Sequence, residues 1–208
     1  MSESPTLPRL MLVTDRRRTR GRQVVPLVVE AVRGGVGIVQ IRELDLADDE
    51  LRGLVEELRG AVPRQTLLVV NGRHGVARTH GSGLHLGAAE PELRQRSAYP
   101  LVGRSAHSVV EARRAVEHRA DYIVLGTIYP TPSKPGHPGF GPSLVARIAS
   151  LVHPTPVYAI GGVVVSRIPE LLHAGAHGVA VCGAILGAND PRRVAQAMAL
   201  ALKVAGGG

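Results

Sequence analysis

Short apolar runs alternate with longer amphipathic segments along the whole chain, and this alternation constrains the fold more than any other feature. Short runs bounded by Gly, Pro or polar residues are typical of buried strands, and apolar residues three or four positions apart are typical of helices. The expected strands are Leu10–Thr14, Val36–Arg42, Thr66–Asn71, Gly83–Leu86, Leu101–Ser105, Asp121–Gly126, Pro156–Ile160 and Gly178–Val181. The expected helices are Val24–Arg33, Asp48–Gly60, Arg73–His80, Pro91–Arg96, Val109–His118, Ser143–Leu151, Val165–Ala174 and Pro191–Val204.

Eight strand-then-helix units predict parallel strands, because a helix between two strands returns the chain to the same end of the sheet. Eight units close most naturally as a barrel. We therefore predict an α/β fold with one (β/α)₈ TIM-barrel domain over residues 1–208, with short helices and lean loops. Residues 1–9 and 205–208 lie outside the pattern and are expected to be flexible. The active site of such a barrel lies at the carboxyl ends of its strands.

The composition narrows the possible classes of function. Hydrophobic residues make up 44% of the chain and charged residues 20%, as in a packed globular domain. The single Cys182 excludes a disulfide framework. The chain has neither an apolar run long enough to span a membrane nor a secretory signal, so a cytoplasmic location is expected.

The net charge is +8, and nearly all of the excess is arginine, since lysine occurs only at Lys134 and Lys203. A basic chain can bind nucleic acid, but the aromatic residues that would stack on bases amount to only 2%. Most arginines are scattered over the expected helices, apart from a cluster at 16–22. We expect no nucleic-acid partner and interpret this cluster as a rim that attracts phosphate.

Glycines follow the last two expected strands, at Gly161-Gly162 and at Gly183 next to Cys182. Glycine lets backbone amides approach an anion, and a short helix that follows presents its positive end. The loops after strands seven and eight are the usual phosphate site of these barrels. The same glycines are also compatible with tight turns alone, but their paired placement favours phosphate binding.

Gln40 and Arg42 lie on one face of the second strand, because side chains alternate along a strand. If that face points into the barrel, Arg42 needs either an anionic ligand or a carboxylate such as Glu43 as its partner. Both possibilities remain open at this point.

The segment 127–142 is rich in Pro and Gly and long for a loop of a compact domain, which favours a functional lid over a mobile surface loop. Its Thr131, Ser133 and Lys134 can together donate several hydrogen bonds to a phosphate.

Two histidines, His107 and His137, lie on segments at the active end and are candidates for proton transfer. His85 lies within a strand, where a hydrogen-bonded core residue is the more common role. The sequence contains no paired-histidine metal spacing, no nucleophile elbow and no Walker loop.

Taken together and in order, the strand-end motifs from residue 10 to about 187 resemble the thiamine phosphate synthase/TenI family. The matching segments are LVTD (12–15), GGVGIVQIRE (34–43), VVN (69–71), LHLG (84–87), GRSAHS (103–108), ADYIVLGTIYPTPSK (120–134), AIGG (159–162) and GVAV (178–181). Each motif is weak alone, but the ordered set is specific. The resemblance implies thiamine biosynthesis and a thiazole phosphate as ligand, bound by the strand-end residues. These are Gln40, Arg42, Asn71, Ser105, Thr131, Ser133, Lys134, Gly161, Gly162, Cys182 and Gly183.

Within the family, the synthases join a pyrimidine diphosphate to a thiazole phosphate with the help of Mg²⁺. The resemblance assigns them a lysine after the QxRE motif, where this chain has Leu44, and an aspartate after the strand-three asparagine, where it has Gly72. Glu90 is the candidate for the second magnesium ligand. These losses remove charge where a diphosphate and Mg²⁺ would need it. They make a synthase the alternative hypothesis.

The leading hypothesis is a TenI-like thiazole tautomerase, an isomerase that moves a proton and needs no cofactor. The resemblance places a histidine directly after the strand-six glycine of such enzymes, where this chain has Thr127. A hydroxyl is a poor base, so we name His107, Thr127 and Glu43 together as catalytic candidates. A catalytically silent thiazole-phosphate binder is a third hypothesis. The resemblance also implies a homo-oligomer.

Overall fold

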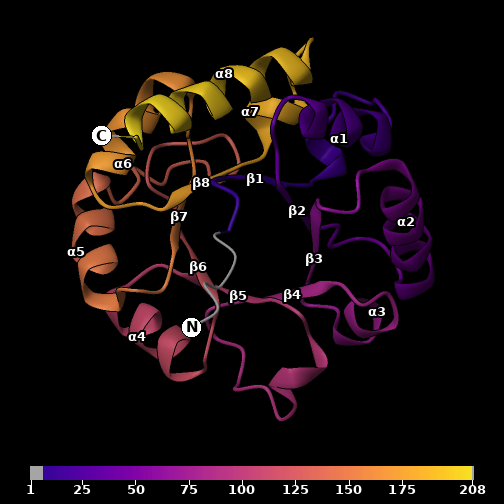
Figure 1. The fold of residues 1–208 in the computed structure, drawn as a ribbon, viewed down its shortest axis with the longest axis horizontal. Coiled ribbons are helices and arrows are strands. Elements are labelled where there is room, and N and C mark those ends of the chain that lie inside the picture. Colours follow the sequence, from indigo (N-terminus) through magenta and orange to yellow (C-terminus); the bar gives the residue numbers. More distant parts are fainter. Residues whose placement is uncertain (1–6, 208) are drawn as a thin grey trace.

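The computed structural model of the protein describes residues 7–207 as a closed barrel of eight parallel strands surrounded by helices (Figure 1). The strands are β1 (Leu10–Val13), β2 (Ile38–Ile41), β3 (Leu67–Asn71), β4 (Gly83–Leu86), β5 (Val102–Ala106), β6 (Tyr122–Gly126), β7 (Val157–Ile160) and β8 (Gly178–Val181). They pair in chain order, and β8 pairs with β1 to close the ring. The predicted (β/α)₈ barrel is confirmed.

The ring of helices follows the predicted order with one gap, between β4 and β5. The α-helices are α1 (Val24–Arg33), α2 (Asp48–Ala61), α3 (His74–Thr79), α4 (Val109–Glu117), α5 (Pro142–Val152), α6 (Ile168–His173), α7 (Gly183–Leu186) and α8 (Pro191–Ala205). Three-residue 3₁₀ turns occur at Arg16–Arg18, Arg96–Ala98 and Val165–Arg167. In the part of the chain that the structure describes, none of the helices has the length and apolar character needed to cross a membrane.

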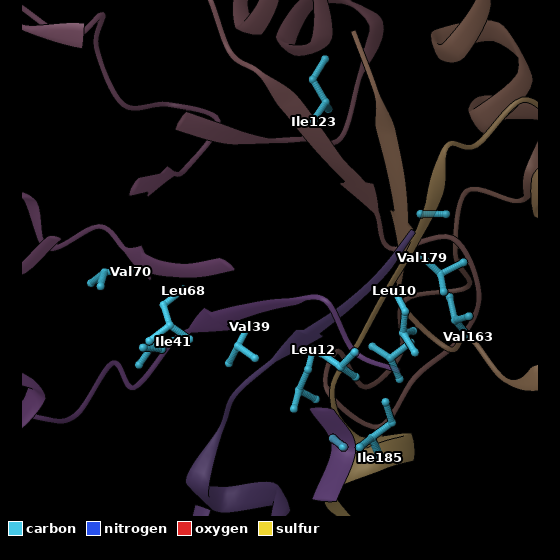
Figure 2. Close-up of a cluster of buried hydrophobic side chains, with 14 of the residues drawn as sticks. Leu10, Leu12, Val39, Ile41, Leu68, Val70, Ile123, Val163, Val179 and Ile185 are labelled. Carbon is cyan, nitrogen blue, oxygen red and sulfur yellow. The ribbon is translucent and has the colours of Figure 1, made fainter. Parts of the chain in front are cut away.

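The larger hydrophobic core lies between the strands and the helices. Figure 2 shows Leu12, Val39 and Val179 of this core, which come from three neighbouring strands of the barrel. Because helices, and between β4 and β5 an irregular segment, cover the outer faces of the strands and side chains fill the inside, both faces are buried and most strands are largely apolar. This double burial explains why short apolar runs were enough to locate all eight strands.

Two aromatic rings pack in the barrel interior toward the amino ends of the strands. Tyr122 and Tyr158 are completely buried, with ring centroids 5.6 Å apart in an edge-to-face arrangement. Gly103 of β5 makes room for Tyr122, since a Cβ at position 103 would overlap the Tyr122 ring. The barrel interior is thus filled with packed side chains toward the amino ends of the strands, and the cavity opens at their carboxyl ends.

The segment before β1 covers the end of the barrel at which the strands begin. The Tyr158 hydroxyl donates to the carbonyl of Pro8 (2.7 Å), and His177 Nε2 lies 2.8 Å from the carbonyl of Leu7. These contacts involve Leu7 and Pro8, and the expectation of flexible ends at 1–9 and 205–208 stays a prediction. Ala205 is the last residue of α8, and residues 1–6 and 208 lie outside the described residues.

The helix predicted at Pro91–Arg96 does not form; this segment is irregular apart from the 3₁₀ turn that begins at Arg96. The cause is a tertiary contact. The guanidinium of Arg104, only 2% exposed, donates to the backbone carbonyls of Glu90 (2.7 Å) and Pro91. These carbonyls would otherwise accept hydrogen bonds within the helix. The long loop before α5, by contrast, is irregular as predicted.

Candidate active site

A cavity of about 660 Å³ opens at the carboxyl ends of the strands. This volume is typical of a small-molecule site. The cavity brings together most of the residues predicted from the strand ends: Gln40, Arg42, Asn71, Ser105, His107, Thr127, Thr131, Ser133, Lys134, Gly161, Gly162, Cys182 and Gly183. Two of the predicted site residues, Glu43 and Glu90, do not line it.

The glycines after β7 serve packing as well as access. Gly161 and Gly162 have φ of +100° and +63°, which favours glycine at both positions. A Cβ on Gly161 would lie 2.5 Å from Thr127 Cγ2, and one on Gly162 would lie 2.5 Å from the carbonyl oxygen of Pro130. The two glycines therefore let the start of the loop 127–142 pack against the end of β7.

Gly183 differs, because a Cβ there would meet nothing within 4 Å. It is the first residue of α7, and the first N–H groups of a helix have no partner inside that helix. The cavity wall at β7 and β8 therefore combines glycine backbone with larger side chains such as Ile160 and Arg167.

Cations line the cavity without a matching acid. In the described part of the chain, the lining includes Arg18, Arg20, Arg42, Lys134 and Arg167, and it contains no Asp or Glu. Like charges around a low-dielectric cleft reinforce one another and attract anions. The predicted rim of arginines after β1 therefore contributes two side chains to the cavity itself.

Asp15, a buried carboxylate beside the cavity residues Arg18 and Arg42, is shared among arginines. It accepts from Arg17 Nε (2.8 Å), while Arg42 Nη2 and Arg18 Nε lie 3.7 and 3.9 Å from its Oδ2 atom. Burial alone would raise the pKa of Asp15, but hydrogen bonds from Arg17 and the charges of Arg17 and Arg42 outweigh it and hold the pKa below its usual value. One carboxylate cannot neutralise three guanidinium groups. Arg42 thus has a strand-end acid, Asp15, as a neighbour, and its binding of an anionic ligand stays a prediction.

The loop 127–142 contacts two of the arginines that line the cavity, Arg18 and Arg167. Arg18 Nη2 donates to the carbonyl of Pro132 (3.3 Å), and the amide of Lys134 donates to the carbonyl of Thr131 in a tight turn. Arg167 stacks on the Tyr129 ring, 4.3 Å from its centroid, and donates to the carbonyl of Gly162. These contacts hold the loop over the cavity and place Lys134 at its lining.

Polar side chains form the floor of the cavity. Gln40 Nε2 donates to Asn71 Oδ1 (3.0 Å), which joins the ends of β2 and β3. His85 is only 1% exposed, and its Nε2 and Nδ1 atoms lie 2.9 Å from Ser105 Oγ and 3.2 Å from the Tyr122 hydroxyl. Burial and, to a lesser extent, the charges of Arg104 and Arg42 lower the pKa of His85 to about 3. His85 is thus a neutral, hydrogen-bonded core residue, as expected.

The three catalytic candidates differ in position. His107 lines the cavity, and its Nδ1 atom lies 3.1 Å from Glu111 Oε2. Thr127 lines it too, but its side chain carries only a hydroxyl. Glu43 is buried away from it and accepts from the Arg16 amide (2.9 Å). Cys182 is no nucleophile at neutral pH, because burial raises the pKa of its thiol to about 11.

The residues assigned to Mg²⁺ by the synthase resemblance do not form a site for it. Position 72 is a glycine, and Glu90 Oε1 accepts from the Gly87 amide (2.7 Å), while its Oε2 atom lies 3.6 Å from His74 Nε2. In the range 7–207, no three His, Cys, Asp or Glu side chains cluster in a way that could hold a metal ion. The donor set therefore does not fit a protein-built magnesium site.

Sequence reasoning did not assign Arg18, Arg20 or Arg167 to the cavity lining. The first two belong to a cluster that was recognised as a rim, but nothing in the pattern shows which of its arginines turn inward. Arg167 lies in the helical segment after β7, where an arginine is ordinarily exposed.

This geometry can be set beside known proteins. Residues 10–185 match the family model described as thiamine monophosphate synthase, TMP-TENI. A thiamine-phosphate synthase of Mycolicibacterium gilvum is 38% identical over 213 residues, which cover 95% of this chain and 90% of the relative. One from Thermobifida fusca is 40% identical over 195 residues, covering 90% and 88%. A solved thiamine phosphate pyrophosphorylase from Pyrococcus furiosus has a TM-score of 0.86 at 27% identity, covering 96% of this chain and 98% of that one.

Proposed function

The chain belongs to the thiamine monophosphate synthase family, and on that premise we propose that it joins a pyrimidine diphosphate to a thiazole phosphate and releases pyrophosphate. The observation that carries this proposal is the cavity that, among residues 7–207, is lined by five cations and by no carboxylate. A phosphate and a diphosphate together bring more negative charge than the phosphate and carboxylate of a tautomerase substrate. The names of the relatives also favour this alternative over the tautomerase that the missing Lys and Asp suggested.

Each part of the cavity suits one part of the two substrates. The exposed backbone at Gly161, Gly162 and Gly183 suits the thiazole phosphate. Arg42 and Lys134 suit the diphosphate, whose departure leaves negative charge that nearby cations stabilise. The neutral polar groups on the floor suit the uncharged rings. Holding both substrates in one cavity aligns the atoms that react.

Arginines offer a source of positive charge in place of the absent lysine and of the Mg²⁺ that the absent aspartate would help to hold. Leu44 is 59% exposed, outside the cavity lining, and Gly72 carries no side chain. Arg18 and Arg42, by contrast, line the cavity, and each has a buried Nε atom without a hydrogen-bond partner within residues 7–207. The two guanidinium groups therefore keep hydrogen-bonding capacity that the surrounding residues do not use, and we expect phosphate oxygens to use it.

A second candidate function, the metal-free tautomerase, is favoured because the side chains of the described residues form no site that fits magnesium. In this case His107 would move the proton. It lines the cavity, and the carboxylate of Glu111 would stabilise its protonated form.

The test is to incubate the protein with pyrimidine diphosphate and thiazole phosphate, with Mg²⁺ or with EDTA, and to measure thiamine phosphate and pyrophosphate. Product formation in either arm supports the synthase. Absence of product, with tautomer conversion of thiazole carboxylate phosphate in EDTA, would replace it by the tautomerase. Tight binding without either reaction would identify a silent binder.

The two lysines of the chain provide a matched pair of variants. Lys134→Ala removes a cation from the cavity lining and is expected to lower kcat/KM about 10- to 100-fold, the loss of one charge-assisted hydrogen bond to phosphate. Lys203→Ala removes a lysine in the last turn of α8, outside this cavity, and should change kcat/KM less than about twofold. Equal effects of the two changes would contradict the role of Lys134.

A further inference from the structure

A chain of three polar groups runs from the packed interior of the barrel to the cavity floor. The Tyr122 hydroxyl lies 3.2 Å from His85 Nδ1, and His85 Nε2 lies 2.9 Å from Ser105 Oγ. Tyr122 and His85 are at most 1% exposed; His85 and Ser105 both line the cavity, and Tyr122 lies behind them. The three residues come from β6, β4 and β5, so the barrel itself holds them in line.

The hydrogens of this chain can be assigned by counting donors and acceptors. A neutral imidazole has one N–H donor and one acceptor nitrogen, and His85 is neutral at physiological pH. The Tyr122 hydroxyl has one hydrogen, and within residues 7–207 its only hydrogen-bond partner is His85 Nδ1. If Nδ1 carried the ring proton, the buried Tyr122 hydrogen would have no acceptor. Such an unpaired group is disfavoured by roughly tenfold or more.

The favoured arrangement therefore has a direction. Tyr122 donates to Nδ1, which places the ring proton of His85 on Nε2, and Nε2–H donates to Ser105 Oγ. Within the described residues, His85 is the only hydrogen-bond partner of the Ser105 hydroxyl. The hydrogen of Ser105 is consequently left to point into the cavity.

We propose that Tyr122 and His85 are positioning residues that fix Ser105 as a hydrogen-bond donor to the bound substrate. Ser105 then selects a ligand that places an acceptor, such as an unprotonated ring nitrogen, at the cavity floor. It disfavours a ligand with an N–H or NH₂ group at the same place, because two donors would face each other. The direction is a property of the free protein, and only the identity of the acceptor atom depends on the proposed function.

The direction is tested by the ¹⁵N NMR spectrum of histidine-labelled protein without ligand. We expect His85 to show a protonated Nε2 and an unprotonated Nδ1 at neutral pH. Tyr122→Phe removes the donor to Nδ1 and should shift this tautomer equilibrium toward Nδ1–H. Tyr158→Phe is the matched control, because it removes an equally buried hydroxyl that donates to Pro8 instead. A wild-type His85 protonated on Nδ1, or the same shift in Tyr158→Phe, would overturn the assignment.

The consequence for the ligand is tested by titrating pyrimidine diphosphate and thiazole phosphate separately by calorimetry. Ser105→Ala should weaken one of them about tenfold, and that substrate carries the acceptor. Tyr122→Phe should weaken the same substrate, with little further loss in the Ser105→Ala background, because both changes remove one interaction. Losses that simply add, or no loss for either substrate, would refute the positioning role. The tautomer result is independent of whether the protein forms thiamine phosphate.

Discussion

Gly103→Ala tests how tightly the interior of the barrel is packed. A Cβ at position 103 would overlap the Cζ, Cε2 and Oη atoms of Tyr122. The Tyr122 ring has no free space to move into, because it is completely buried between His85 and Tyr158, with centroids 5.7 and 5.6 Å away. The added methyl group must therefore displace either a strand or the ring.

The expected cost combines two effects. Overpacking a core of this kind costs about 1–3 kcal/mol. Displacing the Tyr122 hydroxyl from His85 leaves buried polar groups unpaired, which costs about 1–3 kcal/mol more. The free energy of unfolding should therefore fall by about 2–6 kcal/mol, a large part of the 5–15 kcal/mol that is typical of a domain.

Urea denaturation followed by circular dichroism measures this loss. Gly53→Ala is the control, because Gly53 lies in α2 and a Cβ there meets nothing within 4 Å, so this change should stabilise the protein by about 0.5–1 kcal/mol. Adding Tyr122→Leu to Gly103→Ala removes the overlapping ring atoms and should cost less than the sum of the single changes. A loss below about 1 kcal/mol for Gly103→Ala, or strict additivity with Tyr122→Leu, would refute the packing argument.

Two further predictions concern stability. Arg104→Met removes the buried guanidinium that donates to the carbonyls of Glu90 and Pro91. It should lower the free energy of unfolding by about 2–4 kcal/mol and make the loop after β4 sensitive to limited proteolysis. An unchanged cleavage pattern would contradict this prediction. The pKa of Asp15 is depressed in the folded protein, so the stabilisation by its carboxylate is complete above the usual pKa of about 4 and is lost as the pH falls below it. In urea titrations, the excess stability of the wild type over Asp15→Asn should therefore shrink below about pH 4. A difference in stability that stays constant with pH would contradict this prediction.

The sequence predicted the strands well because each barrel strand is buried on both faces. An apolar run such as Gly178–Val181 therefore carries its structural signal locally, without reference to the rest of the chain. The failure at Pro91–Arg96 has the opposite cause. Local spacing favours a helix there, but Arg104, which follows in the next strand, binds the carbonyls that the helix would need. A contact of this kind cannot be read from the segment itself.

The candidate site shows the same division. Strand-end position was enough to place Gln40, Asn71 and Ser105 at the cavity, because alternation and parallel pairing determine where they point. Glu43 was expected there as well, but its carboxylate is drawn toward Arg16 and away from the cavity. Arg18, which lines the cavity, likewise contacts a distant segment, because it donates to the carbonyl of Pro132 in the loop 127–142. Side chains that choose between several partners are the ones that the sequence pattern cannot place.

The departures from the synthase pattern are not imposed by the fold. A Cβ at Gly72 would meet nothing within 4 Å, and although its φ of +67° favours glycine, aspartate is among the residues that tolerate this region best. Leu44 is exposed, so a lysine there would meet no packing constraint. The barrel therefore has room for both residues. Relative to the synthase pattern that the resemblance implies, Leu44 and Gly72 remove one positive and one negative charge from the ends of β2 and β3, and restoring them tests the electrostatics there without a packing cost.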